Sequence, residues 1–192
     1  MKRLCLPLLL ICLLLCACGS KEAESQYDAF AQSLSEADTL SFTAALRCEY
    51  EDRTLEFTVR YEQEGESTAV TVLAPELVAG VKARIVQDST ALEYEGIRID
   101  TGDLDGYGLS PMSALYSLTE AMRSGHLESS WTEDGRAVYQ LIANDHLYAV
   151  VSFEPESMCP VRAELVSEGH VRVVCDISGW SMDAAQAAEP LE

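Results

Sequence analysis

Residues 42–61, FTAALRCEYEDRTLEFTVRY, decide the fold, because apolar and polar side chains alternate on both sides of a short acidic turn. The apolar positions of this stretch are Phe42, Ala44, Leu46, Cys48, Tyr50, Leu55, Phe57, Val59 and Tyr61. Alternation with a period of two is typical of a strand with one buried face. The Glu51-Asp52 pair between the two runs suits a turn. The stretch therefore predicts two antiparallel strands.

Similar short runs continue along the chain on both sides of a helical segment. The further predicted strands are Ala69–Leu73, Val81–Val86, Ala91–Ile99, Leu127–Thr132, Ala137–Ala143, Leu147–Phe153, Val161–Val166 and Val171–Trp180. Turn-forming pairs such as Asp134-Gly135 and Glu168-Gly169 recur at roughly ten-residue spacing, as in consecutive hairpins. We expect about ten strands in one antiparallel arrangement.

Two segments have the helical period instead. Residues 21–40 carry an apolar stripe of Ala23, Tyr27, Phe30, Ala31 and Leu34. The second helix is expected after Ser110-Pro111, which suits an N-cap followed by proline, with Gly125 as its C-cap. The predicted fold class is α+β: a curved antiparallel sheet or half-barrel with an N-terminal helix and one mid-chain helix.

The first residues predict export. Lys2 and Arg3 precede an apolar run that ends at Ala17, which is the layout of a secretory signal and is short for a membrane span. Leu15-Cys16-Ala17-Cys18 then resembles the lipobox of bacterial lipoproteins. The resemblance implies that Cys18 receives fatty acyl chains such as palmitate and becomes the new N-terminus, on the extracytoplasmic side of the cell membrane. The alternative is an ordinary signal peptide in which Cys18 has no role.

These observations divide the chain into four parts. They are a signal peptide (1–17), a lipidated tether (18–24), one sheet-and-helix domain (25–180) and a flexible acidic tail (181–192). Thirteen Lys plus Arg against 32 Asp plus Glu give a formal charge of −19, which argues against nucleic-acid binding. The acidic body is repelled by anionic headgroups, so acyl chains must hold it at the membrane. We favour solubility over a cation-binding face as the reason for this acidity.

Three cysteines remain after the leader and Cys18, namely Cys48, Cys159 and Cys175. An exported protein can form disulfides, but an odd number of thiols allows at most one pair within the chain. Cys159 with Cys175 is the predicted pair, because the two flank a predicted hairpin. Three free thiols that pack as small apolar residues remain an open alternative.

The order of the elements resembles the LolA/LolB lipoprotein-localisation family over about Ser25 to Trp180. The stretch Val70-Thr71-Val72-Leu73-Ala74-Pro75, which precedes a further strand, belongs to the same resemblance. The resemblance implies that an incompletely closed sheet wraps around helices and leaves an apolar cavity for acyl chains. The residues that would line such a cavity are Phe57, Val59, Tyr61, Tyr94, Leu115, Leu118 and Met122. The alternative, which we favour, is that the same residues pack as a filled core.

Two functions are compatible with this sequence. The first is a membrane-anchored, non-catalytic protein that binds or carries an apolar ligand such as a lipid or a lipoprotein segment. The second is an interaction module with a solid core that docks another envelope protein. A cavity would favour the first function. An exposed apolar patch or an unpaired strand edge would favour the second.

No motif supports catalysis, a cofactor or a metal. His126, His146 and His170 are scattered without a second ligand at metal-site spacing. Gly108–Met112 lacks the last glycine of a nucleophile elbow. Asp103–Gly106 resembles part of a calcium loop, but the positions around it lack the required oxygen ligands. We therefore expect a protein that is not an enzyme and needs no cofactor.

Overall fold

The structure is a computed structural model that describes residues 19–50, 52–86, 89–103 and 109–184. Its helical elements are α2 (Gly19–Ser35), the 3-10 turn η1 (Glu76–Val78) and α3 (Pro111–Ser124). The strands before α3 are β1 (Ala37–Glu49), β2 (Thr54–Glu64), β3 (Ser67–Ala74), β4 (Lys82–Val86), β5 (Ser89–Tyr94) and β6 (Ile97–Asp103). Those after α3 are β7 (His126–Glu133), β8 (Arg136–Asn144), β9 (Leu147–Phe153), β10 (Pro160–Ser167) and β11 (His170–Ala184).

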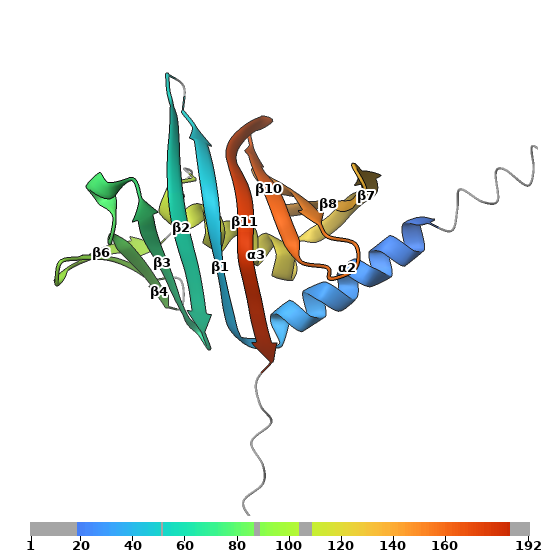
Figure 1. Cartoon of the computed structure of the whole chain (residues 1–192), viewed down its shortest axis with the longest axis horizontal. Coiled ribbons are helices and arrows are strands. Elements are labelled where there is room, and N and C mark those ends of the chain that lie inside the picture. The colour runs from blue at the N-terminus through green and yellow to red at the C-terminus, as the bar shows by residue number, and fades with distance from the viewer. Residues whose placement is uncertain (1–18, 51, 87–88, 104–108, 185–192) are drawn as a thin grey trace, which may run out of the picture.

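All eleven strands form one antiparallel sheet in the order β6-β5-β4-β3-β2-β1-β11-β10-β9-β8-β7. The two longest strands, β1 and β11, pair at its centre, where Leu46 lies opposite Cys175. On each side of them the chain continues as a meander of neighbouring hairpins (Figure 1). We call β2–β6 the N-terminal arm and β7–β10 the C-terminal arm. The order leaves β6 and β7 as the two edge strands.

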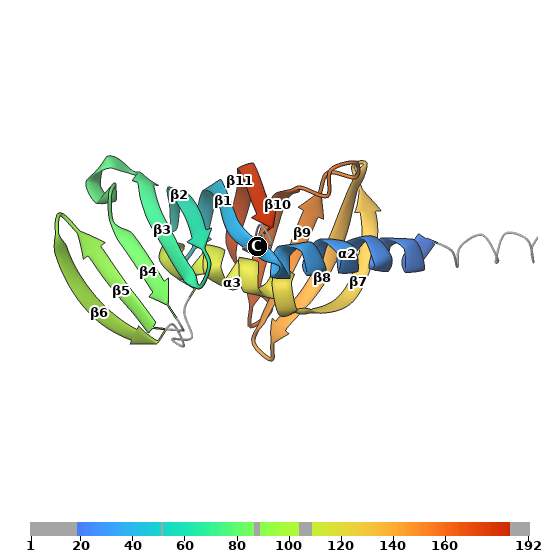
Figure 2. The same ribbon diagram turned by 90° about the horizontal axis from the view of Figure 1, so that it is seen from below.

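Both helices lie on the same face of the curved sheet, which we call the inner face (Figure 2). The main contacts of α3 are with α2, β2, β3 and β8–β10, and those of α2 are with α3 and β7. Apolar side chains of the strands point to this face, so every second residue of β1 from Leu40 to Cys48 is buried. The core therefore lies between the sheet and the two helices.

The predicted fold class is confirmed, and two element boundaries differ from the prediction. The first helix ends at Ser35 instead of residue 40, because Leu40 is already an inward-facing strand residue of β1. The run Ala91–Ile99 was expected to be one strand but forms β5 and β6, with a turn at Glu95-Gly96. Both turn residues have positive φ, of 48° and 82°, which suits a tight hairpin turn. The sheet consequently has one strand more than the ten expected.

The expected tether and tail are partly structured. The helix α2 begins at Gly19, so most of the tether expected at 18–24 is helical. The strand β11 extends to Ala184, where it pairs with Ala37, so it includes the start of the tail expected at 181–192. The expected signal peptide and Cys18 lie outside the described residues. No helix among the described residues is long and apolar enough to cross a membrane.

The predicted start of α3 is confirmed by a reciprocal cap. The Ser110 hydroxyl accepts the Ser113 N–H at 3.1 Å, and the Ser113 hydroxyl accepts the Ser110 N–H at 3.0 Å. At the other end, the Gly125 N–H donates to the Ala121 carbonyl at 2.9 Å. Gly125 is extended, with φ −66° and ψ 150°, so it is not a left-handed cap. Glycine is required there because a Cβ atom would collide with the Ala121 carbonyl oxygen.

Candidate functional site

Five of the seven residues expected to line a cavity meet in the core. They are Val59 and Tyr61 of β2 and Leu115, Leu118 and Met122 of α3, and none has any solvent-exposed surface. Such complete burial is typical of interdigitated side chains packed at the density of a crystal. These residues therefore form part of a filled core in this structure, as in the alternative to a cavity.

The other two predicted residues lie at the margin. Phe57 is half-buried and packs against the core from the first half of β2. Tyr94 does not join the cluster: it lies at the end of β5, is 42% exposed, and its ring lies beside Gly80. Tyr94 therefore does not meet the other predicted residues, because the sheet extends beyond the reach of α3 at this strand.

An aromatic cluster joins α2 to the C-terminal arm. Tyr27 of α2 lies 5.1 Å from Tyr139, and Phe30 lies 4.9 Å from Phe153, both measured between ring centroids. The Tyr27 hydroxyl donates to the Met122 carbonyl at 2.8 Å, in the last turn of α3. The stripe of α2 identified Tyr27 and Phe30 as inward-facing, but nothing in the sequence indicated their partners.

One buried polar group of this cluster has no hydrogen-bond partner. The Tyr139 hydroxyl is fully buried and unpaired, whereas the Tyr27 hydroxyl beside it is satisfied. Burial raises the pKa of both phenols, so both are protonated at neutral pH. The cluster therefore contains no charged group and no group primed for acid–base catalysis at neutral pH.

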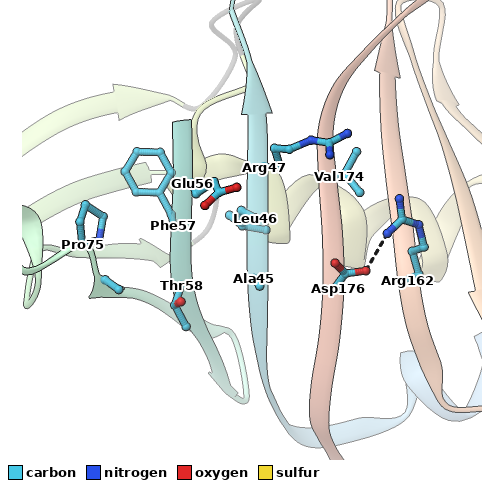
Figure 3. A pocket seen from close by; sticks show the side chains of 11 residues that line it. Ala45, Leu46, Arg47, Glu56, Phe57, Thr58, Pro75, Arg162, Val174 and Asp176 are labelled. Carbon is cyan, nitrogen blue, oxygen red and sulfur yellow. Dashed lines mark hydrogen bonds and ion pairs between the residues drawn. The ribbon is translucent and has the colours of Figure 1, made fainter. Parts of the chain in front are cut away.

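A groove crosses the outer face at the centre of the sheet (Figure 3). Its volume is about 460 Å³, and it is lined by Ala45, Leu46, Arg47, Glu56, Phe57, Thr58, Ala74, Pro75, Arg162, Val174 and Asp176. Three of the four charged residues that line it are already paired: Arg162 bonds Asp176 at 2.8 Å, and Arg47 bonds Glu49, outside the groove, at 3.0 Å. The groove is thus polar and close to charge balance, and no titratable group in it stands out as a catalytic acid or base.

The apolar row of the inner face continues to the edge strand β6. Tyr61 lies opposite Val70, Val70 opposite Ala83, Ala83 opposite Leu92, and Leu92 opposite Ile99. Residues directly opposite one another share a face of the sheet. Exposure rises along this row from 0% at Val70 and Ala83 to 60% at Ile99. The core row therefore ends in solvent.

We call the end of this row, together with the neighbouring pair of Tyr94 and Ile97, the open end, and define it by Leu92, Tyr94, Ile97 and Ile99. Ile97 is 65% exposed and lies opposite Tyr94. Figure 2 shows β4–β6 extending beyond both helices. The open end combines exposed apolar side chains with an edge strand, a pairing that favours docking of another polypeptide.

The outer side of the open end carries an ion-pair network. The Arg98 guanidinium lies 3.3 Å from Glu93 and 3.3 Å from Asp100, and Arg84 lies 2.8 Å from Glu93. The hydrogen bond from Arg84 and the nearby cations hold the pKa of Glu93 below its ordinary value. Charges thus alternate on the outer face of β5 and β6 while isoleucines occupy the inner face of β6.

The three cysteines of the described residues are free. Cys175 lies opposite Ala163, and Cys159 comes four residues before Ala163, which places it roughly 13 Å along the strand direction. A disulfide requires Cα atoms within about 7 Å. The predicted Cys159–Cys175 pair is therefore absent from the structure. Burial raises the pKa of Cys48 to about 11 and that of Cys175 further still, so these thiols are unreactive.

The remaining polar candidates do not assemble into a site. His126, His146 and His170 are exposed at the starts of β7 and β11 and in the β8–β9 turn. Within residues 19–50, 52–86, 89–103 and 109–184, no group of three or more His, Cys, Asp or Glu could hold a metal. Most of the calcium-loop resemblance at Asp103–Gly106 lies outside the described residues.

No protein-family model matches the chain, and no curated protein shows significant similarity to it. Several solved structures are similar to it. An uncharacterized conserved protein from Thermus thermophilus has a TM-score of 0.51 at 12% identity, over 86% of this chain and 90% of that one. A DUF1329 family protein from Desulfovibrio piger has a TM-score of 0.50 at 12% identity, over 86% and 95%. A LolA superfamily protein from Nitrosomonas europaea has 0.43 at 12%, over 83% and 94%. At such identities the first two similarities show a shared fold.

Proposed function

We propose that this chain is an exported protein, fastened to the cell membrane by acyl chains on Cys18, that acts as a non-catalytic module for docking another polypeptide at the open end. The leader and the Cys18 motif support export and anchoring. The observation that carries the docking function is the exposure of Ile97 and Ile99, at 65% and 60%, on an edge strand.

The structure favours a polypeptide over a lipid as the ligand. Five of the seven residues expected to hold an acyl chain, Tyr61 and Leu118 among them, lie fully buried in the core. An edge strand also presents backbone N–H and C=O groups, which an added strand can pair and a hydrocarbon chain cannot. Apolar burial at about 25 cal/mol per Å² would add to those hydrogen bonds.

The position of the open end suits a membrane-anchored protein. The helix α2 begins at Gly19, directly after the proposed anchor, and its start lies at the opposite end of the molecule from β6 (Figure 2). An anchor at Cys18 would therefore leave the open end accessible to a partner.

Photo-crosslinking tests the docking function. A photoreactive amino acid at Ile97 should form adducts with polypeptide, whereas the same residue at Trp131 should not. Trp131 is the matched control, because it is 40% exposed and lies on β7, the other edge strand. Absence of adducts from position 97, or identical adducts from both positions, would contradict the proposal.

Native mass spectrometry of a Cys18→Ala chain distinguishes the carrier function from the docking function. A filled core predicts the mass of the polypeptide alone. A lipid retained at constant stoichiometry would instead favour a carrier.

Fatty-acid labelling tests the anchor. The unmodified chain should incorporate label and fractionate with membranes, and Cys18→Ala should lose both properties. A wild-type chain without label, or a Cys18→Ala chain labelled to the same extent, would rule out anchoring through this residue.

A further inference from the structure

The edge strand β6 has a sequence that is complementary to itself. Ile97 and Ile99 point to the inner face, and Arg98 and Asp100 to the outer face, as their partners on β5 require. When two identical strands pair antiparallel, a central residue can lie opposite its own copy. The residue before it on one strand then faces the residue after it on the other. If two β6 strands pair about Ile99, Arg98 of each copy faces Asp100 of the other. Each of these charges then lies opposite a charge of the other sign, and the two Ile99 side chains meet on the inner face.

We propose that the polypeptide docked at the open end is β6 of a second copy of this chain, antiparallel and centred on Ile99. The inference rests on the proposed docking function and names its partner. The two sheets become one continuous sheet, and the inner-face isoleucines of the two copies lie side by side. Each Arg98, now 3.3 Å from Asp100 of its own strand, gains Asp100 of the other copy as a cross-strand partner.

Only this register satisfies the charges. Centring the pair on Arg98 brings two arginines face to face, and centring it on Asp100 brings two aspartates face to face. A shift by a single residue would turn the isoleucines of one strand to the outer face. Opposite charges directly across a strand pair contribute about 0.2–1 kcal/mol, and like charges there are destabilising. The pattern at positions 97–101 therefore selects a single arrangement.

The same pattern disfavours a foreign basic strand. The formal charge of −19 would attract a cationic segment over long range, but a strand with cations at successive outer-face positions would place one of them opposite Arg98. The net charge also makes two copies repel each other away from the contact. Association should accordingly be weak in solution and stronger between copies tethered to one membrane, where the effective concentration is high.

A charge exchange between copies tests the inference. Full-length chains with two different affinity tags are co-expressed and recovered from membranes in detergent. We expect wild-type copies to co-purify, and Arg98→Asp with Arg98→Asp, or Asp100→Arg with Asp100→Arg, to do so about tenfold less, as two reversed pairs predict. A mixture of Arg98→Asp with Asp100→Arg should restore co-purification, because every charge again faces its opposite. Equal recovery in all four combinations, or no rescue in the mixed one, would overturn the proposal.

Cysteine cross-linking tests the register. Ile99→Cys should form a disulfide between copies, because directly opposite Cα atoms lie within about 5.5 Å. Ile97→Cys alone should cross-link less than Ile99→Cys, because position 97 does not lie opposite its own copy in this register. The chain without these substitutions is the control for Cys159. If position 99 cross-links only to a different protein, the second-copy inference fails while the docking function stands; if it cross-links to no polypeptide, both fail.

Discussion

The two arms of the sheet differ in what covers their inner face. The C-terminal arm packs against α2 and α3, and aromatic contacts such as that of Phe30 with Phe153 cover its inner face. The outer strands of the N-terminal arm, β5 and β6, carry the same alternation of apolar residues without a helix over them, and Ile97 and Ile99 are exposed. One alternating pattern thus builds a core on one arm and a docking surface on the other.

The largest expected effect compares a covered with an uncovered apolar residue. Leu118→Ala should lower the free energy of unfolding by about 2–5 kcal/mol, because it leaves a cavity beneath α3. Ile99→Ala, at 60% exposure, should change it by less than about 0.5 kcal/mol. Urea denaturation of the two variants measures both values. Similar losses would show that the open end is packed in solution, which would contradict the difference between the arms.

The second prediction concerns the joint between the two helices. Tyr27→Phe should destabilise the protein by about 1–2 kcal/mol, because the Met122 carbonyl at the end of α3 loses its donor. Tyr139→Phe is the matched control, since its hydroxyl has no partner and its removal should be neutral or stabilising. Thermal unfolding of the two variants would contradict this assignment if Tyr139→Phe were the more damaging.

These comparisons show which parts of the fold were predictable from sequence. Alternation predicted the inward-facing residues of β1 and β2, and Ser110-Pro111 predicted the start of α3, because strand period and helix capping are local properties. Whether a helix covers a strand is not a local property. Tyr94 and Tyr61 both occupy apolar positions of an alternating pattern, yet α3 covers only Tyr61. The number of strands was also missed, because Glu95-Gly96 was the only sign of a turn within an otherwise continuous run.

The candidate site was less predictable than the fold for a similar reason. Sequence gives the identity of Val59, Leu115 and Met122 but not the volume left between them, so the pattern favoured a filled core without excluding a cavity. The self-complementary strand 97–101 became visible only when β6 was known to be an edge, which requires the order of all eleven strands.

A third prediction uses the three thiols of the described residues. Cys159, which is partly exposed, should react with a thiol reagent in the native protein, and Cys48 and Cys175 only after unfolding. Counts of native and denatured thiols check this. A chain lacking both the Cys159 and Cys175 thiols after denaturation would contain the disulfide that the structure lacks.

A fourth prediction is that alkaline pH lowers the free energy of unfolding through the buried Cys48 thiol. Burial raises the pKa of Cys48 from 9.0 to about 11, so the folded state keeps a proton that the unfolded state loses above pH 9. The free energy of unfolding should therefore be unaffected by this group below pH 9 and fall as pH rises from 9 to 11. Urea midpoints across that range should fall less steeply for Cys48→Ala than for wild type. An identical slope would show that the Cys48 thiol titrates normally.

The smallest expected effect is that of the edge charges on the isolated fold. Arg98 and Asp100 are 61% and 79% exposed, so Arg98→Asp should alter the free energy of unfolding by less than about 1 kcal/mol. Arg162→Asp, which breaks a similarly exposed pair at the centre of the sheet, should cost as little and leave association between copies unchanged. If both substitutions weakened co-purification equally, the contact between copies would lie elsewhere. If only Arg98→Asp weakens co-purification and the free energy of unfolding is unchanged, the lost association is due to the edge strand β6. Neither substitution alters the core that both arms share.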